Sequence, residues 1–120
     1  MVRASLPHLR NGNGSYVVVS SVGLRRWPAR DVLSVAPKAT IEALVRGIAS
    51  EEGHFGIRAN SVALGVIEAG IFLRLERVDF DREWVEAARN NTALKRFGTA
   101  EEVANAVVFL ASARASYLTG

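Results

Sequence analysis

Three side chains near the start of the sequence are of types that proton-transfer chemistry uses. Ser21 ends an apolar run, and Lys38 follows Ser34 by four residues in the segment DVLSVAPKAT, residues 31–40. An amine can act as the base of a serine nucleophile, and a positive charge lowers the pKa of a neighbouring hydroxyl acid. If the amine of Lys38 acts as such a base, the protein would be a hydrolase with Ser34 or Ser21 as its nucleophile. The sequence shows no oxyanion-hole or acid element for this chemistry.

Pro37 bears on which element carries these residues. A proline ring disfavours helical backbone at the preceding residue, Ala36, and proline itself suits the first position of a helix. We therefore expect a helix that begins at Pro37 and leaves Ser34 in the loop before it. A lysine at a helix start is unfavourable beside the helix dipole, so the position of Lys38 indicates a functional reason for it.

The apolar pattern before Lys38 predicts a short helix and a strand. Residues 4–10 read as the end of a helix, which the turn residues NGNG, 11–14, terminate. The β-branched run 15–22 is apolar on both faces, which is typical of a strand in a parallel sheet covered on two sides. A loop is expected from about Gly23 through Trp27 and Pro28.

A helix and a second strand are predicted after Lys38. A helical stripe begins after Thr40 and ends near Gly53; its members are Ile41, Leu44, Val45, Ile48 and Ala49. Residues 56–64 read as a strand in which Asn60 is expected to bond backbone groups. Strand, helix and strand in this length form a βαβ unit with a right-handed crossover, so the predicted fold class is α/β.

The remainder of the sequence is predicted to be mainly helical. Residues 65–80 have no clean period and form either a long loop or a loop with a short helix, the usual place for a substrate lid. Residues 81–91 predict a helix opened by Asp81, and residues 99–113 predict a helix with a Thr99–Glu102 capping box. Because two parallel strands leave two unpaired sheet edges, the pattern indicates part of a larger domain.

Composition and charge narrow the function classes. The 120 residues fit one domain, with 49% hydrophobic and 22% charged residues. There is no cysteine, and His8 and His54 are far apart, so we expect no metal site. The basic residues that give the net charge of +3 are scattered along the chain, except for the adjacent pair Arg25 and Arg26. This distribution favours a solvated surface over a nucleic-acid site. No apolar run approaches the roughly 20 residues of a membrane span, and we expect a cytoplasmic protein.

Four stretches resemble the short-chain dehydrogenase/reductase family. They are VVVSSV (17–22), Lys38, GIRANSVALGVIEAG (56–70) and LKRFGTAEEVANAVVFLASARASYLTG (94–120). In that family a serine closes the fifth strand, and a Tyr-x-x-x-Lys pair begins thirteen residues later. Ser21 and Lys38 match both counts, and Ser34 then stands where the tyrosine would be. The resemblance covers nearly the whole chain and implies a doubly wound, Rossmann-like parallel sheet.

The resemblance implies an oxidoreductase that uses NAD or NADP. Hydride transfer to a carbonyl leaves negative charge on the oxygen, which must be protonated. By resemblance, Ser21 donates a hydrogen bond to that oxygen, Ser34 occupies the place of the proton donor, and Lys38 supports the donor and binds the nicotinamide ribose. The segment after the second strand is similar to the family's nicotinamide contact; it includes Leu64, Gly65, Ile67 and Ala69.

Several positions depart from the family pattern. The aliphatic hydroxyl of Ser34 is a much poorer acid than a phenol, whose pKa is about 10. Tyr16 cannot replace the phenol, because it lies about 16 Å before Ser21 along the strand and on the opposite face. Leu64 replaces a proline, and Ala69 replaces a threonine. No TGxxxGxG turn is present, so the sequence lacks the family's phosphate cradle.

We therefore expect residues 1–120 to be a single, partial domain, without the glycine-rich cofactor half and the last strand. The isolated chain is predicted to be inactive and to show no detectable NAD(P)H binding, an expectation that a titration giving micromolar affinity would refute. The alternative is a non-catalytic interaction module, as a truncated product or a pseudo-enzyme. Family members pack the helices corresponding to residues 1–10 and Ala39–Glu52 against a second subunit, so a homo-oligomer is expected. The sequence specifies neither the substrate nor a choice between NAD and NADP.

Overall fold

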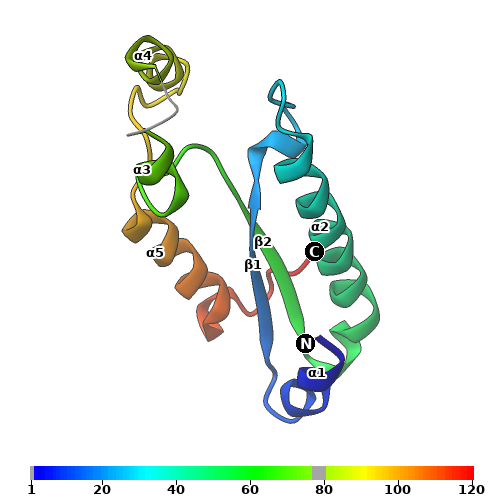
Figure 1. Ribbon diagram of the computed structural model, residues 1–120. Coiled ribbons are helices and arrows are strands. Elements are labelled where there is room, and N and C mark those ends of the chain that lie inside the picture. The colour runs from blue at the N-terminus through cyan, green and yellow to red at the C-terminus, as the bar shows by residue number, and fades with distance from the viewer. Residues whose placement is uncertain (1, 77–80) are drawn as a thin grey trace.

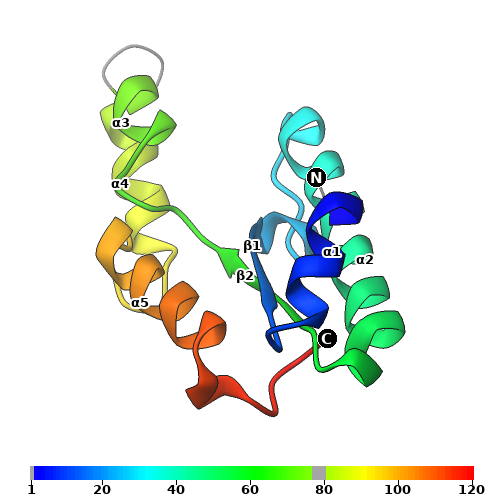
Figure 2. The same ribbon diagram turned by 90° about the horizontal axis from the view of Figure 1, so that it is seen from below.

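The chain folds into a two-stranded parallel sheet with helices on both sides, as a computed structural model that describes residues 2–76 and 81–120 shows (Figure 1). In chain order the elements are α1 (Val2–Arg10), β1 (Ser15–Ser21), α2 (Val32–Glu52), β2 (Arg58–Leu64), α3 (Ile71–Glu76), α4 (Arg82–Asn90) and α5 (Ala100–Ala111). Helices α1 and α2 lie on one side of the sheet, and α3, α4 and α5 lie on the other (Figure 2). The predicted α/β class and the βαβ unit are confirmed.

The strand register places the two carboxyl ends of the sheet side by side. Ser15 pairs with Arg58 at one end, and Ser21 pairs with Leu64 at the other. In open α/β sheets, ligands bind beyond the carboxyl ends of the strands. The register alone therefore brings Ser21 next to the start of the segment that follows β2.

The hydrophobic core lies between the sheet and α2. Val45, Ile48, Ile57 and Ala59 form its buried centre, with apolar side chains of α1 and β1 packed against it. On the other side of the sheet, α5 contains no buried residue, and its Val108 remains 67% exposed. The packing that holds the sheet is therefore concentrated on the side of α1 and α2.

Helix α2 begins five residues earlier than the proline rule predicts. It starts at Val32 and carries Pro37 inside it, so the expectation of a helix start at Pro37, with Ser34 in a loop, is wrong. The proline removes one N–H donor, which would have bonded the Leu33 carbonyl. Because Leu33 is 89% exposed, water can satisfy that carbonyl, and one missing bond near the helix end is tolerated.

The C-terminal residues run along the outer edge of β2. The backbone N–H of Gly120 donates to the Ala59 carbonyl at 2.9 Å, and the Thr119 hydroxyl accepts from the Ala59 N–H at 3.1 Å. Asn60 donates its amide to the Leu118 carbonyl at 2.8 Å, in keeping with the structural role predicted for it. The prediction of two unpaired edges is therefore wrong for β2, whereas no described strand pairs with the other edge of β1.

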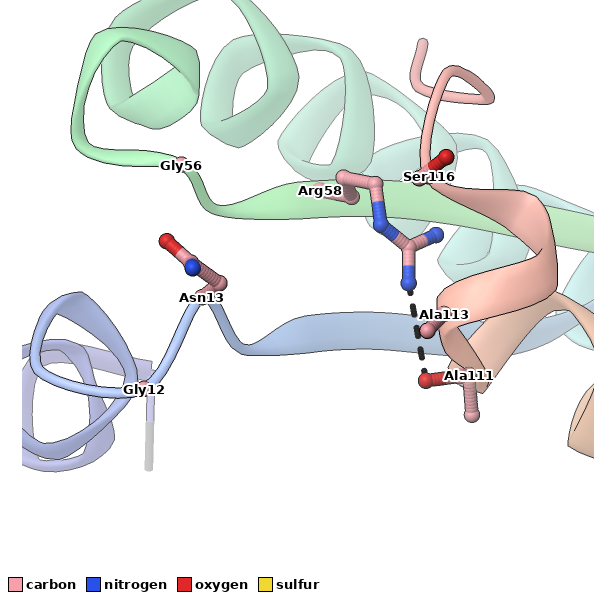
Figure 3. A pocket seen from close by; sticks show the side chains of 7 residues that line it. All are labelled: Gly12, Asn13, Gly56, Arg58, Ala111, Ala113 and Ser116. Atoms are coloured by element: carbon pink, nitrogen blue, oxygen red, sulfur yellow. Dashed lines mark hydrogen bonds between the residues drawn. The ribbon is translucent and has the colours of Figure 1, made fainter.

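Arg58 ties α5 to the amino end of the sheet (Figure 3). Its guanidinium donates to the Leu110 carbonyl at 2.7 Å, one of the carbonyls left without a helical partner at the end of α5, and to the Ser112 carbonyl at 3.1 Å. A cavity of about 660 Å³ adjoins this contact. It lies at the amino ends of the strands, away from Ser21 and Lys38.

The remaining helices follow the predicted punctuation. Asp81 caps α4, and Thr99 and Glu102 form the predicted capping box of α5. Helix α3 confirms the version of the 65–80 prediction that includes a short helix, whereas residues 77–80 of the predicted lid lie outside the described residues. Within the described part of the chain, no helix is long and apolar enough to cross a bilayer.

Candidate functional site

All three predicted catalytic residues line one cleft at the carboxyl end of the sheet. This serine cleft has a volume of about 450 Å³ and lies between β1, α2 and the segment after β2. Ser21, Ser34 and Lys38 form part of its wall, together with Leu64 and Gly65. Residues distant in sequence are brought together because the two strand ends and the start of α2 meet at the same edge.

The predicted cofactor-binding residues line a second, adjoining cavity. This apolar cavity has a volume of about 360 Å³ and shares Ser21, Lys38, Leu64 and Gly65 with the serine cleft. Ile67 and Ala69 complete the predicted set, and Phe72 and Trp84 add aromatic surface. The site therefore consists of two adjoining spaces, with Ser21 and Lys38 on the boundary between them.

The Ser21 hydroxyl accepts a hydrogen bond, while its own hydrogen remains available to donate. Its Oγ accepts a hydrogen bond from the Gly23 N–H at 3.0 Å and so caps the short turn after β1. Gly23 is buried there, and a Cβ on it would lie 3.0 Å from Val35 Cγ2 and 3.1 Å from Ser21 Oγ. No acceptor among the described residues takes the Ser21 hydroxyl hydrogen, so this O–H can donate into the cavities.

Lys38 and Ser34 contact each other on one face of α2. Because the helix starts at Val32, their four-residue spacing places them one turn apart, and Lys38 Nζ donates to Ser34 Oγ at 3.1 Å. Ser34 is exposed and Lys38 is half-buried. The position that the family gives to its tyrosine is therefore within reach of the lysine.

A buried hydroxyl holds the end of β1 against α2. Ser20 is 3% exposed, and its Oγ is hydrogen-bonded to the Glu42 carboxylate, one helical turn beyond Lys38. The same Oγ accepts from the Ser21 N–H at 2.6 Å. This link fixes the strand end that carries Ser21 relative to the helix that carries Lys38.

A second set of contacts holds the segment after β2. The Glu68 N–H donates to the Gly98 carbonyl at 2.8 Å, and the Gly98 N–H donates to the Val66 carbonyl at 3.1 Å. A Cβ on Gly98 would lie 2.7 Å from Ile67 Cδ1, so a larger residue there would displace the end of the Ile67 side chain. The wall of the apolar cavity is thus attached to the residues that precede α5.

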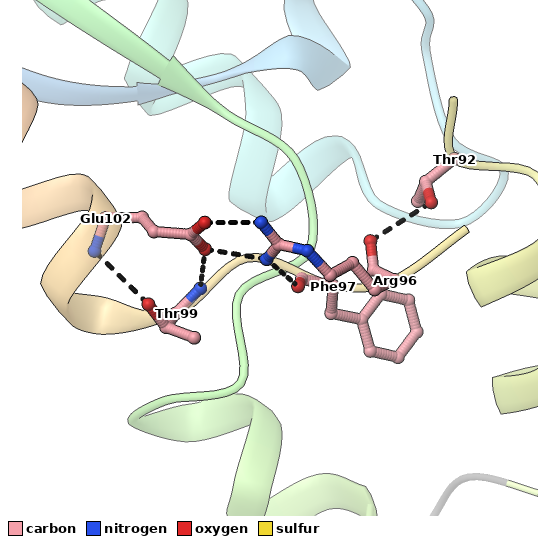
Figure 4. Close-up of polar contacts among 5 residues, drawn as sticks. All are labelled: Thr92, Arg96, Phe97, Thr99 and Glu102. Carbon is pink, nitrogen blue, oxygen red and sulfur yellow. Dashed lines mark hydrogen bonds and ion pairs between the residues drawn. The ribbon is translucent and has the colours of Figure 1, made fainter. Parts of the chain in front are cut away.

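Charged and polar contacts stabilise the chain around Gly98 (Figure 4). Arg96 donates to both carboxylate oxygens of Glu102, at 2.8 and 2.5 Å, and the Thr99 N–H donates to Glu102 Oε2 at 2.9 Å. The hydrogen bonds from Arg96, followed by the one from Thr99, lower the pKa of Glu102 to about 2. The Glu102 carboxylate therefore joins the α5 capping box to the strand-like contact at Gly98.

Some residues of the site were not found from sequence. Arg26, Asp31, Asn91 and Thr92 line the serine cleft, although the sequence favoured a solvated loop for Arg26, with contact to a cofactor phosphate as the alternative. The link between Ser20 and Glu42 was also missed, because it depends on how the strand packs against the helix. Arg26 lies between the two predicted serines in sequence, and this position was the one available signal for it.

The two tyrosines do not supply the missing phenol. Tyr16 Oη lies 2.6 Å from Ser5 Oγ and 3.2 Å from the Val2 carbonyl oxygen, on the α1 side of the sheet. The Tyr117 side chain is fully exposed near the C-terminus and lines neither cavity. Ser34 therefore provides the only hydroxyl at the position beside Lys38 among the described residues.

Comparison with known sequences assigns the whole chain to one family. A family model described as enoyl-(acyl carrier protein) reductase matches residues 1–120. Tropinone reductase-like 3 of Erythroxylum coca is 33% identical over 100% of this chain and 45% of its own length. Galactitol 2-dehydrogenase of Rhizobium johnstonii is 43% identical over 69% of this chain and 31% of its own length.

Comparison with solved structures shows the same fold. A short-chain oxidoreductase from Pseudomonas aeruginosa PAO1, with NADPH bound and described as containing an atypical catalytic center, is 33% identical with a TM-score of 0.85. The match covers 98% of this chain and 47% of that one. The chain thus spans about half the length of the relatives it matches.

Proposed function

Because this chain belongs to the short-chain dehydrogenase/reductase family, we propose that it forms the catalytic and nicotinamide-contacting part of an NAD(P)-dependent oxidoreductase. One observation carries the proposal. Ser21, Ser34 and Lys38 line one cleft, the residues after β2 line the adjoining cavity, and Ser21 and Lys38 belong to both. Carbonyl and cofactor would then meet where the proton-handling side chains lie.

The chain's own residues would act on the reacting oxygen. A bound nicotinamide supplies or accepts the hydride at the carbon. As negative charge develops on the oxygen, the free O–H of Ser21 donates a hydrogen bond to it. Lys38 lies 3.1 Å from Ser34 and supports the hydroxyl in the place of the proton donor. Because that hydroxyl is aliphatic, we expect proton delivery to be slow.

The apolar cavity fits the nicotinamide end of the cofactor. Leu64, Ile67 and Ala69 give it an apolar wall, and Lys38 supplies a cation at its boundary for a ribose hydroxyl. The solved relative from Pseudomonas aeruginosa has NADPH bound. The present sequence contains no glycine-rich phosphate turn, so we expect no micromolar affinity of the isolated 120-residue chain for NADH or NADPH.

A chimaera tests the oxidoreductase function. The parts of the Pseudomonas aeruginosa enzyme that flank the region matched by this chain are fused to its two ends, and carbonyl-dependent oxidation of NADPH is followed. We expect slow turnover that Lys38→Met reduces by about tenfold or more and that Ser34→Tyr increases by about a hundredfold or more.

The control for this experiment is the other lysine. Lys95 donates to the Asn90 carbonyl at 2.6 Å and lines neither cavity, so Lys95→Met should leave turnover unchanged. A chimaera that binds NADPH but responds to neither Lys38→Met nor Ser34→Tyr would disprove the proposed roles.

A second candidate function is self-association through α2. Within the segment predicted to contact another subunit, Ala39–Glu52, the side chains of Ile41 and Leu44 are 37% and 48% exposed. Apolar side chains at helical spacing on an open surface favour packing against another helix. The exposed pair supports the expected homo-oligomer.

Sedimentation at protein concentrations on the order of tens of micromolar tests whether the chain self-associates through α2. We expect a dimer that Leu44→Glu converts to monomer, whereas Leu33→Glu, at an exposed position outside Ala39–Glu52, leaves it intact. A folded monomer at these concentrations would exclude the interaction module.

A further inference from the structure

Arg26 is a cationic residue of the serine cleft for which the hydride chemistry gives no role. It lies in the loop between β1 and α2 and lines the cleft with Ser21, Ser34 and Lys38. It does not line the apolar cavity, so it is outside the proposed nicotinamide contact. Its position is therefore on the side of the cleft that remains for the substrate.

The Arg26 guanidinium has no protein partner in the part of the chain that the structure describes. Its backbone N–H donates to the Val22 carbonyl at 3.1 Å, but its side chain forms no ion pair or hydrogen bond with a described residue. Arg58 differs in this respect, because the carbonyls at the end of α5 accept its hydrogen bonds. Arg26 thus retains its planar set of donors for a ligand.

The serine cleft carries a net positive charge. Its ionisable lining residues are Arg26, Asp31 and Lys38. The Asp31 side chain makes no capping bond to α2 and forms no ion pair with a described residue. One carboxylate offsets one of the two cations, which leaves one positive charge in a cleft of about 450 Å³. Clefts of this size take small organic molecules.

We propose that Arg26 recognises an anionic group of the substrate, so that the serine cleft takes a small carbonyl compound or alcohol that also carries a carboxylate. The inference rests on the proposed function for the position of the reacting oxygen, at Ser21 and Ser34. A guanidinium pairs with a carboxylate through two parallel hydrogen bonds, which fixes orientation as well as charge. Arg26 would then determine specificity without taking part in proton transfer.

Two small ligands that differ mainly in charge test this proposal. Levulinate, which has a ketone and a carboxylate, is compared with levulinamide, its neutral analogue, in amide NMR titrations of the 120-residue chain at matched ionic strength. We expect levulinate to shift the backbone amides of Gly23, Gly65 and Val66, which line the cleft. Arg26→Gln should weaken this binding by about tenfold or more, and levulinamide should bind weakly to both proteins.

Arg25 provides the matched control, since it is the neighbouring arginine and does not line the cleft. Arg25→Gln should leave levulinate binding within about twofold, because screened surface charge contributes little. Equal weakening by Arg25→Gln, equal binding of levulinamide, or the absence of levulinate-induced shifts in the cleft would each overturn the proposal. No nicotinamide is present in this titration, so a chimaera that fails to transfer hydride would disprove the oxidoreductase function separately.

Discussion

Ser34 and Lys38 are in contact at the two positions that the resemblance gives to a hydroxyl acid and its supporting lysine, although the Ser34 hydroxyl is aliphatic. Lys38 Nζ lies 3.1 Å from Ser34 Oγ, and both residues line the serine cleft with Ser21. The proposed site thus departs from the family pattern in the acidity of one group, while Ser21 and Lys38 match that pattern in type and spacing. Restoring a phenol should restore the electrostatic relation with the lysine.

The first prediction concerns the pKa of an introduced phenol. In Ser34→Tyr, the positive charge of Lys38 should lower the phenol pKa by about one unit or more from its usual value near 10. Ultraviolet titration of the variant, with the wild-type titration of Tyr16 and Tyr117 subtracted, measures it. The same substitution in a Lys38→Met background is the control, and an identical phenol pKa in both backgrounds would contradict the contact.

Two glycines should respond in opposite ways to the same substitution. Gly56 has a φ of +78°, and a Cβ there would lie 2.4 Å from Asn13 Oδ1, whereas a Cβ on Gly47 in α2 meets no atom within 4 Å. We expect Gly56→Ala to lower the free energy of unfolding by about 1 kcal/mol or more. Gly47→Ala should raise it by about 0.5–1 kcal/mol. Urea unfolding compares them, and a destabilised Gly47→Ala protein would contradict the open surroundings of Gly47.

Ser21 and Lys38 could be placed from the sequence because their types and spacing match the pattern of the family that the chain resembles. Arg26 and Glu42 could not be placed in the same way. Arg26 enters the cleft through the path of a loop, and Glu42 meets Ser20 only after the strand packs on the helix. The family resemblance thus predicted the proposed proton-handling groups, but it did not predict the groups that position them or the arginine proposed to face the substrate.

At the scale of elements, the Arg96–Glu102 pair connects α5 to the wall of the apolar cavity. It braces the residues on either side of Gly98, whose backbone pairs with Val66 and Glu68. Both side chains are about half exposed, at 51% and 48%, so the pair should be sensitive to salt. Protonation of the Glu102 carboxylate should nevertheless lower the stability of the fold at acid pH.

Glu102 should contribute to acid unfolding in a defined pH range. Its pKa is lowered from 4.5 to about 2 by Arg96 and by the Thr99 N–H, so the folded state binds the proton less readily than the unfolded state. The resulting stabilisation is complete above the unfolded pKa and is lost as the pH falls through about 2. In Glu102→Gln, thermal stability should therefore fall less between about pH 5 and pH 2 than in the wild type.

Glu101→Gln is the control for this measurement. It removes a carboxylate from the same helical turn, and Glu101 forms no ion pair with a described residue. The wild-type pH dependence should persist in this variant. Parallel pH profiles for the wild type and Glu102→Gln would show that the carboxylate does not hold its lowered pKa in solution.

Elements set by local interactions were predicted well. The α5 capping box follows from Thr99 and Glu102 alone, and Asp81 marks the start of α4 in the same way. The start of α2 was predicted wrongly, because the proline rule weighs the steric bias against helix at Ala36 and neglects the packing of the preceding turn. Val35 in that turn is 0% exposed, and its burial favours helix before Pro37.

At the scale of the whole molecule, the chain has a one-sided core and an unpaired β1 edge. Its buried centre lies between the sheet and α2, while α5 keeps apolar side chains at its surface. The pairing of residues 118–120 with β2 was not predicted, because an irregular terminal segment has no periodic pattern. The partial character of the domain was inferred from its two strands, and the relatives it matches are about twice as long.

The division of cofactor contacts between this chain and the rest of a family domain predicts that the adenine half of the cofactor adds no affinity for this chain. Lys38, Gly65 and Ile67 would contact the nicotinamide ribose and ring, while no glycine-rich turn in this sequence would hold the pyrophosphate. Reduced nicotinamide mononucleotide should therefore bind about as weakly as NADPH, since the adenine half finds no partner here.

The most direct test of the account is an amide NMR titration of the 120-residue chain with reduced nicotinamide mononucleotide. We predict weak, saturable shifts centred on Ser21, Gly65 and Ile67 that disappear in Lys38→Met and persist in Lys95→Met. Shifts that lie elsewhere, or that survive the loss of Lys38, would contradict a nicotinamide site beside this lysine.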